Sequence, residues 1–471
     1  APSTRALNAC RMRTTAVVQA TALISLLLSD CLVESAFIRG VNLNVFVPER
    51  WMVPSFYAGT NATSLCDLSR QHPALAAERM HKRLESVGSA DFAWLAEQGF
   101  NAVRVPLGWW NVVSDVGWWW LHYPVGPHES LAVIDRLFEW ADAHGLAILL
   151  DLHGAPGSQN GADHSGCDLY GIGWGSDASV DLSLRVIGAL AARYGAHPAL
   201  LGVELLNEPG WGVEWDHGKL YSYYSRALAL VRAVSSGALV VFNELFYDDF
   251  PAGFGNWWSG QLSDPRVAMD LHLYDCFGTA SGRSLEEHIA QARVWARRIR
   301  ELQGQGHHIM VGEWSLATGA HEGGQAWADA QLSAFNDTLG WFFWSYRIEG
   351  ADNGGVTWSL RGAIDAGITG IAAPPHPISP RPSKPHPITP RPAEPRPAAA
   401  GRSPKGDAAP PVGLAAAAPA AGSPRRDTAA AGGGVTGGTV ATEAVATEAV
   451  ATEAVATEAV ATEAVATEAV A

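Results

Sequence analysis

The chain has 471 residues, of which 48% are hydrophobic and 19 are tryptophan, and its formal net charge at pH 7 is −15. This length and hydrophobic content suffice for a large folded core. The negative charge argues against nucleic acid as a partner, because phosphate contacts require a basic surface, whereas the many tryptophans favour carbohydrate, since aromatic faces stack on sugar rings.

Residues 1–36 have the pattern of a secretory signal. Arg11 and Arg13 precede an apolar stretch at 16–28, and small residues follow up to Ala36. The apolar stretch is shorter than the roughly 18 residues that span a bilayer. We therefore expect a signal peptide or start-site extension, a secreted protein of the cell exterior or cell wall, and no membrane span.

Removal of this segment would leave three cysteines, Cys66, Cys167 and Cys276. Three cysteines allow one disulfide and one free thiol, and the sequence does not determine which two pair. Asn-x-Thr tripeptides begin at Asn61 and Asn336 and fit a secreted glycoprotein.

Residues 37–371 alternate short β-rich runs with longer amphipathic segments. Helices are expected at 131–144, 182–194, 221–235 and 285–303, and the first has the apolar spacing of one buried helical face. Strands that alternate with helices predict a (β/α)8 barrel. A doubly wound open sheet is the alternative, but no Gly-x-Gly-x-x-Gly motif opens a helix. The eight expected strands are 38–44, 102–107, 147–153, 200–206, 239–244, 267–274, 309–314 and 341–346.

The composition changes after residue 371. A proline-rich ten-residue repeat at 375–392 is followed by alanine and glycine runs, and Val-Ala-Thr-Glu-Ala then occurs six times over 440–469. Dense proline favours an extended, unpacked chain, and a five-residue period matches neither helix nor strand. We expect 372–471 to be a disordered tail, and no apolar segment in it indicates a membrane anchor.

Two glutamates stand at the carboxyl ends of predicted strands. Glu208 lies in Leu-Asn-Glu-Pro and Glu313 in Val-Gly-Glu-Trp-Ser. Carboxylates at these places in a barrel are poorly solvated and are candidates for catalysis. Cleavage of a glycosidic bond requires two carboxylates that face one cleft.

The motifs around these glutamates occur in chain order, each at a predicted strand. They are Arg-Gly-Val-Asn-Leu at 39–43, Asn-Ala-Val-Arg-Val-Pro at 101–106, Asp-Leu-His-Gly-Ala-Pro-Gly-Ser-Gln-Asn-Gly at 151–161, Asn-Glu-Pro at 207–209, His-Leu-Tyr at 272–274 and Gly-Glu-Trp-Ser at 312–315. Residues 38–365 thereby resemble glycoside hydrolase family 5, and specifically its exo-β-1,3-glucanase branch. The run at 151–161 is the most specific part of the resemblance.

The resemblance implies a retaining enzyme that releases glucose from the non-reducing end of β-1,3-glucan. It identifies Glu208 as the acid/base and Glu313 as the nucleophile. We expect an apolar wall and the charge of Glu313 to keep Glu208 protonated, and Arg104 to keep Glu313 ionised. The resemblance also implies substrate contacts from Asn207 to the sugar 2-hydroxyl, from His153, His272 and Tyr274, and from Trp344 beneath the sugar.

No metal or other cofactor is expected. His307 and His308 are adjacent, so on a strand they point to opposite sides, and neither a His-Glu-x-x-His nor a Gly-x-Ser-x-Gly motif occurs. A second Asn-Glu pair ends at Glu244, but it lacks the following proline. We expect Glu244 to contact a substrate hydroxyl or to pair with a cation at the barrel mouth.

Other functions remain open. The branch usually has Gly-Gly-Trp where this chain has Asn44, Val45 and Phe46, and Trp-Lys-Thr-Glu where it has Tyr-Arg-Ile-Glu at 346–349. These departures leave open another family 5 activity, on β-1,4- or β-1,6-glucan or on a sterol or lipid glucoside. A glucan-binding wall protein without catalysis is the alternative from another class. We expect the protein to be a monomer whose partner is a β-linked polysaccharide or oligosaccharide.

Overall fold

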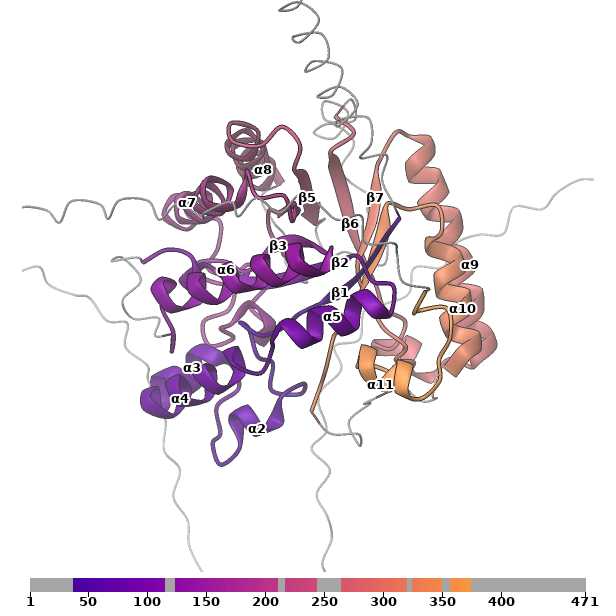
Figure 1. The fold of residues 1–471 in the computed structure, drawn as a ribbon, viewed down its shortest axis with the longest axis horizontal. Helices are drawn as coiled ribbons and strands as arrows, with labels where there is room; N and C mark the ends of the chain where they lie inside the picture. Colours follow the sequence, from indigo (N-terminus) through magenta and orange to yellow (C-terminus); the bar gives the residue numbers. More distant parts are fainter. Residues whose placement is uncertain are drawn as a thin grey trace, which may run out of the picture. The chain divides into compact units, whose positions relative to one another are not determined.

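The computed structural model describes residues 37–114, 123–210, 217–243, 264–319, 324–349 and 356–373. In these residues eight parallel strands pair in sequence order, and the last pairs with the first to close a barrel (Figure 1). The predicted (β/α)8 fold is confirmed, and the open-sheet alternative is wrong. The strands are β1 (Ile38–Asn42), β2 (Ala102–Gly108), β3 (Ala147–Gly154), β4 (Leu200–Glu204), β5 (Leu239–Asn243), β6 (Val267–Leu273), β7 (Ile309–Trp314) and β8 (Gly340–Phe343).

Helices lie around the barrel, and α6 shows how the sequence specifies them (Figure 1). This helix runs over Pro127–His144, with a proline in its first turn, where the missing N–H has no helical partner to lose. Gly145 ends it in the left-handed conformation, with φ of 72°. The apolar residues with the spacing of one helical face are buried at Ile134, Leu137, Phe138 and Ala141, and Leu131 is half-buried. The other helices are α2 (Pro54–Tyr57), α3 (Leu65–Gln71), α4 (Pro73–Leu84), α5 (Ser89–Glu97), α7 (Asp177–Tyr194), α8 (His217–Arg232), α9 (Leu285–Gly304), α10 (Gly324–Phe335) and α11 (Leu360–Asp365).

The interior of the barrel is filled in layers, because inward-facing side chains on a strand are two residues apart. Towards the amino ends of the strands the layer is apolar. Two residues further along β2, β3 and β6, the inward positions hold Arg104, Asp151 and Asp270, all buried. The next step places His153 and His272 at the carboxyl ends. The apolar layer consists of Ile38, Ala102, Leu149, Val241, Ala268, Met310 and Phe342.

An irregularity in β7 decides where Glu313 points. The pairing of β6 with β7 changes register after Leu271, so that His272 lies beside Glu313. The Gly312 N–H donates to the carboxylate of Asp270, and a Cβ at Gly312 would collide with that carboxylate. Glycine therefore makes room for Asp270, and the shift, like a β-bulge, re-aims Glu313 into the barrel mouth.

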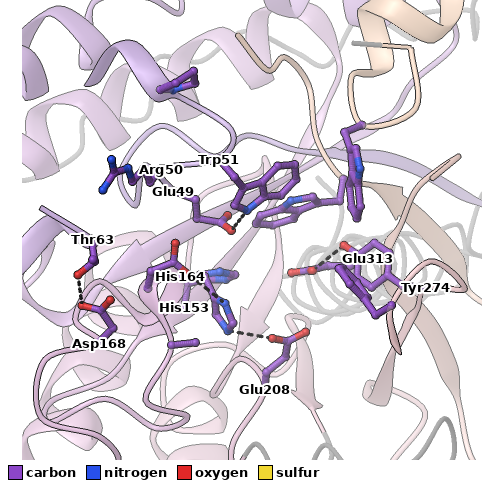
Figure 2. Close-up of a pocket in the computed structure, with 16 residues that line it drawn as sticks. Glu49, Arg50, Trp51, Thr63, His153, His164, Asp168, Glu208, Tyr274 and Glu313 are labelled. Atoms are coloured by element: carbon purple, nitrogen blue, oxygen red, sulfur yellow. Dashed lines mark hydrogen bonds and ion pairs between the residues drawn. The ribbon is translucent and has the colours of Figure 1, made fainter. Parts of the chain in front are cut away.

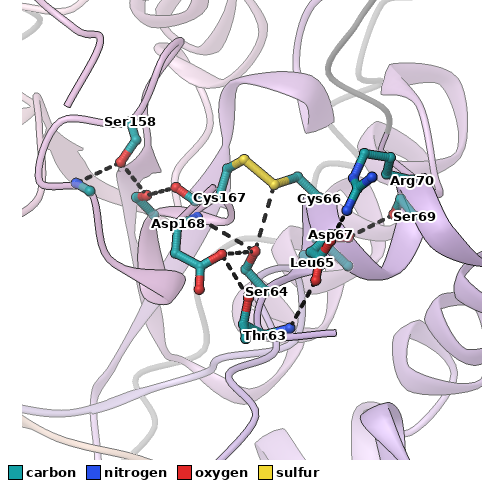
Figure 3. Close-up of a disulfide and its surroundings, with 12 residues drawn as sticks. Thr63, Ser64, Leu65, Cys66, Asp67, Ser69, Arg70, Ser158, Cys167 and Asp168 are labelled. Carbon is teal, nitrogen blue, oxygen red and sulfur yellow. Dashed lines mark hydrogen bonds and ion pairs between the residues drawn. A yellow bond between two sulfur atoms is a disulfide. The ribbon is translucent and has the colours of Figure 1, made fainter. Parts of the chain in front are cut away.

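A disulfide joins two segments that are far apart in the sequence. Cys66, in α3, pairs with Cys167, in the connection between β3 and α7, and their Cα atoms are 5.1 Å apart (Figure 3). Beside it, the Ser64 hydroxyl donates to Asp168 at 2.5 Å. Cys276 is a buried free thiol. The pairing that the sequence left open is thus Cys66 with Cys167.

The folded part of the chain continues slightly past the expected boundary at 371. Ile371 is buried, and the N–H of Ala373 donates to the carbonyl of Gln98 at 2.9 Å. No helix among the described residues is long and apolar enough to cross a membrane. The predictions for the segment 1–36, for the tail from residue 374 and for Glu244 lie outside the described residues.

Candidate active site

The two glutamates meet at the carboxyl ends of the strands. Glu313 is the second-last residue of β7, and Glu208 lies just after the end of β4. Carboxylate oxygens of Glu208 and Glu313 and a ring nitrogen of His272 all lie within 4.8 Å of one another. Glu208 has a φ of 39°, a conformation that a side chain with a Cβ rarely adopts and that clusters at functional sites. The structure therefore brings the two predicted catalytic residues together.

Arg104 is the buried cation of the site. Its Nη1 donates to Oε1 of Glu313 at 2.9 Å, which is the ion pair that the sequence predicted. Its Nε and Nη2 donate to both carboxylate oxygens of Glu204, at 2.7 and 2.9 Å, and Nη2 also lies 3.1 Å from Asp151. Several carboxylates around one guanidinium outweigh the cost of burial and raise the pKa of Arg104 well above its usual range.

Asn207 is fixed by the same guanidinium. Its Oδ1 accepts from Nη2 of Arg104 at 2.8 Å, and the side chain is fully buried. Its Nδ2 has no hydrogen-bond partner among the described residues. A buried donor without a partner costs free energy unless a ligand satisfies it, so Asn207 presents a donor of fixed orientation beside Glu208.

Tyr274 completes the support of the nucleophile candidate. Its hydroxyl donates to Oε2 of Glu313 at 2.9 Å (Figure 2). With Arg104 on Oε1, both oxygens of Glu313 accept a hydrogen bond, and the orientation of the carboxylate is fixed. Burial and the nearby charge of Glu313 raise the pKa of Tyr274 well above its usual range, so its hydroxyl remains a donor.

Glu208 is held between two imidazoles. His272 Nδ1 lies 2.6 Å from Oε1, and His164 Nε2 lies 3.1 Å from Oε2. Burial by itself would raise the pKa of Glu208, but the hydrogen bonds from His164 and His272 outweigh it, and the pKa lies well below its usual range. The expectation that an apolar wall keeps Glu208 protonated is therefore wrong. In the free site the protons reside on the imidazoles.

His153 and Trp344 pack against each other at the pocket. Burial holds the pKa of His153 well below its usual value, so the ring is neutral. Its Nδ1 lies 2.7 Å from Asp151, and a proton on Nδ1 leaves Nε2 as an acceptor. The ring stacks on Trp344, with centroids 5.5 Å apart and planes 12° from parallel. Both residues line the pocket, and their contacts with substrate stay predictions.

The pocket in front of these residues has a volume of about 1140 Å³ (Figure 2). Ligand pockets usually hold roughly 300–1,000 Å³, so this one has room for more than one sugar ring. Of the eight predicted site residues, three lie beneath the lining: Arg104, Asn207 and His272. The five that line it are His153, Glu208, Tyr274, Glu313 and Trp344.

The sequence analysis missed several lining residues. Glu49 follows β1, and burial raises its pKa to about 8. Asp163 and His164 follow β3, directly after the specific run at 151–161. The signal that could have found them is their place in loops at the carboxyl ends of strands.

Aromatic rings form one side of the pocket. Trp51 and Trp358 also line it, with ring centroids 5.0 Å apart, and Trp358 lies 5.4 Å from Tyr274. Ten other tryptophans lie in or near the loops that follow predicted strands. Three of them are buried in the core: Trp109, Trp110 and Trp174. The other seven lie outside the described residues: Trp118, Trp119, Trp120, Trp211, Trp215, Trp257 and Trp258.

Within the part of the chain that the structure describes, three sets of side chains have donor atoms close enough to hold a metal. In each set a carboxylate is already bonded within the chain: Glu49 accepts from Trp51, Glu204 from Arg104, and Glu208 from its two imidazoles. We therefore assign no metal site, and the absence of a cofactor stays a prediction. The sets are Glu49 with Asp163 and His164, Glu204 with Asp270 and His272, and Glu208 with His272 and Glu313.

Comparison with known proteins identifies the family. The family model described as Cellulase (glycosyl hydrolase family 5) matches residues 79–350, which is more than half of the chain and includes both glutamates. The chain belongs to glycosyl hydrolase family 5. It is therefore a glycosidase, as the sequence predicted.

Two related proteins match this chain over most of their length. The probable glucan 1,3-beta-glucosidase A of Emericella nidulans is 32% identical over 407 residues, which cover 75% of this chain and 95% of that protein. The glucan 1,3-beta-glucosidase of Blumeria graminis is 29% identical over 386 residues, covering 70% and 86%. Among solved structures, the rutinosidase from Aspergillus niger covers 70% of this chain and 97% of its own, with a TM-score of 0.60 and 19% identity. That likeness bears on the fold alone.

Proposed function

We propose that this protein is a retaining β-glycosidase with Glu313 as the nucleophile and Glu208 as the acid/base. The observation that carries the proposal is the gap between them, because their carboxylate oxygens approach within 4.8 Å. In retaining enzymes the two carboxyl groups are about 5–5.5 Å apart, whereas inverting enzymes need about 6.5–9.5 Å to admit a water. The short gap favours double displacement.

In the first step Glu313 attacks the anomeric carbon, while Glu208 takes a proton from one of its imidazoles and gives it to the leaving oxygen. Arg104 and Tyr274 aim the attacking carboxylate. In the second step Glu208, again a carboxylate, takes a proton from water, and that water releases the sugar from Glu313. The hydrogen bonds from the imidazoles, which lower the pKa of Glu208, suit this second role.

The other residues position the sugar. Asn207 Nδ2 donates to the 2-hydroxyl, a contact that strengthens in the transition state. The neutral ring of His153 accepts from a hydroxyl through Nε2, and Trp344 packs against the sugar face. His272 bridges the two glutamates, with Nδ1 2.6 Å from Glu208 and 3.4 Å from Glu313.

The substrate in this proposal is β-1,3-glucan, cleaved from its non-reducing end with release of glucose. The relatives from Emericella nidulans and Blumeria graminis are named as glucan 1,3-beta-glucosidases, which supports the linkage. The size of the pocket and its aromatic wall of Trp51 and Trp358 suit a short run of sugar rings.

Secretion is part of the same proposal. Disulfides persist in oxidising compartments, and the chain has one between Cys66 and Cys167. The signal-like segment at 1–36 agrees with this. The monomeric state and the glycosylation of Asn61 and Asn336 remain predictions.

The experiment that tests the roles is azide rescue of Glu313→Ala. This variant should lose turnover of β-glucosides while it still binds sugar and unfolds at the temperature of the parent. Azide that enters in place of the missing nucleophile gives an α-glucosyl azide. NMR spectroscopy identifies the product, and near-normal hydrolysis by Glu313→Ala would overturn the assignment.

Glu208→Ala is the matched control. Here the glycosyl-enzyme still forms from activated substrates, and azide attacks it from the other face to give a β-glucosyl azide. Equal products from both variants would contradict the two roles. Release of sugar from laminarin, cellulose, pustulan and mannan then decides the linkage, and the proposal requires laminarin to be preferred.

A further inference from the structure

Glu204 is a carboxylate buried beneath the pocket. It is the last residue of β4, its side chain is 0% exposed, and it does not line the pocket. Its two oxygens accept from Nε and Nη2 of Arg104, at 2.7 and 2.9 Å. Because the guanidinium is rigid and planar, two bonds along one of its edges fix the plane of the whole group.

The contact with Glu204 also fixes the directions of the other N–H groups of Arg104. Nη2 donates to Oδ1 of Asn207 at 2.8 Å, and Nη1 donates to Oε1 of Glu313 at 2.9 Å. Nη1 also donates to Oδ1 of Asn42 at 2.9 Å. If the guanidinium turned, Asn207 and Glu313 would lose their donor at the same time.

The other contacts of Arg104 with described residues each join one nitrogen to one acceptor. Oδ2 of Asp151 lies 3.1 Å from Nη2, and the same oxygen lies 2.7 Å from Nδ1 of His153. Asn42 accepts from Nη1 alone. A single contact lets the plane of the guanidinium turn about it, whereas a pair of bonds does not. Of these contacts, the pair of bonds to Glu204 therefore constrains the orientation most.

The paired contact does not depend on the charge of Glu204. Burial raises the pKa of Glu204 well above its usual range, against the opposing charge of Arg104. Both oxygens nevertheless accept from Arg104, so the side of the carboxyl group that faces the guanidinium carries no proton. The orientation of Arg104 therefore follows from the geometry of the two bonds.

We infer that Glu204 is a positioning residue that holds Arg104, and through it Asn207, in the orientation that meets the sugar 2-hydroxyl. The inference rests on the proposed function, in which Asn207 Nδ2 donates to that hydroxyl. Nδ2 has no other partner among the described residues, and the bond from Arg104 to Oδ1 sets its direction. A misplacement of about 1 Å in such a contact can lower the rate roughly 100-fold.

The test compares 4-nitrophenyl β-glucoside with its 2-deoxy analogue in Glu204→Gln. Glutamine keeps the shape of the side chain but replaces one acceptor oxygen by an NH2 group, which cannot accept from Arg104. We expect kcat/KM for the glucoside to fall by about 10- to 100-fold, and the ratio of kcat/KM between the two substrates to fall by about 10-fold or more. Both values come from one preparation, so the ratio does not depend on the fraction of protein that is folded.

A second variant covers a loss of folding, because removal of one partner from a buried pair is costly. Glu204→Asp keeps the carboxyl group but is shorter by one CH2 group, so it cannot reach both nitrogens, and its ratio should also fall. The control is Asp135→Asn. This change breaks a similar two-point pair, between Asp135 of α6 and Arg193 of α7 outside the pocket, and should leave the ratio at the parental value.

The combination with Asn207→Ala separates a positioning role from a structural one. In a chain that already carries Asn207→Ala, Glu204→Gln should leave the ratio unchanged, because the contact with the 2-hydroxyl is already lost. Three outcomes would overturn the inference: a parental ratio in both Glu204 variants, a parental ratio in Asn207→Ala, or an equal fall with and without Asn207. Failure of the proposed function itself looks different, because Glu313→Ala would then remain active, whatever the Glu204 variants do.

Discussion

At the scale of single residues, buried neighbours set the orientation and the protonation of the candidate catalytic side chains. Arg104 orients Glu313 and Asn207 at once, so removal of its charge would disturb the nucleophile and the sugar contact together. Burial raises the pKa of Glu208, whereas its two imidazoles lower it and decide where the proton resides. Burial alone predicts the wrong direction for this group.

The unpartnered amide of Asn207 gives a prediction at this scale. Asn207→Ala should lower kcat for β-glucosides by about 100-fold, or roughly 2.7 kcal/mol, because it removes a contact that strengthens in the transition state. On a 2-deoxy-glucoside, which lacks the partner hydroxyl, the same variant should lose much less. Equal losses on the two substrates would show that Asn207 acts only through Arg104.

At the scale of elements, the strands are rigid supports and the loops after them complete the site. The loop after β3 carries Asp163, His164 and Cys167 within a few residues. The disulfide to Cys66 and the hydrogen bond from Ser64 to Asp168 attach this loop to α3 and the residue before it (Figure 3). The disulfide thus bears on the position of His164 as well as on stability.

Loss of this disulfide should lower both stability and affinity. The bond joins residues 101 apart in the sequence, and a loop of about 100 residues corresponds to at most about 4.7 kcal/mol in the chain-entropy model, with about 2–4 kcal/mol typical. Cys66→Ser with Cys167→Ser should lower the free energy of unfolding in urea by that typical amount and raise KM. Cys276→Ala keeps the disulfide and is the control. If neither the double variant nor a reductant changed the urea concentration at the midpoint of unfolding, this prediction would be contradicted.

At the scale of the whole molecule, the sequence of the barrel can bury apolar side chains in a core, whereas the sequence of the repetitive tail cannot. Ile371 is buried in the core, and the N–H of Ala373 donates to the carbonyl of Gln98, which follows α5. The proline-rich repeat and the five-residue repeat beyond them have no consistent apolar face. We expect stability to depend on the chain up to residue 373.

Two truncated chains test this boundary. A chain that ends at residue 373 should keep the activity and the unfolding temperature of the full chain. A chain that ends at residue 370 also loses Ile371, whose burial contributes about 1.5–3 kcal/mol, and should unfold at a lower temperature. A large loss in the first chain would show that residues beyond 373 pack on the barrel.

The sequence by itself determined the barrel, its eight strands and the pair Glu208 and Glu313. These features follow from local patterns, since apolar runs define buried strands and barrel topology places all their carboxyl ends at one mouth. The ion pair of Arg104 with Glu313 was also expected, because a carboxylate that must stay ionised at the barrel mouth needs a cation nearby, and Arg104 lies on a predicted strand.

Only the tertiary structure decided the disulfide partner of Cys66, the turn of Glu313 into the mouth and the low pKa of Glu208. Each depends on a distance between segments that lie far apart in the sequence. His164 precedes Glu208 by more than forty residues, and no periodicity records that its ring would lie 3.1 Å from that carboxylate. The charge state of a group is set by what lies within a few ångströms in space, and that information arises only when the chain has folded.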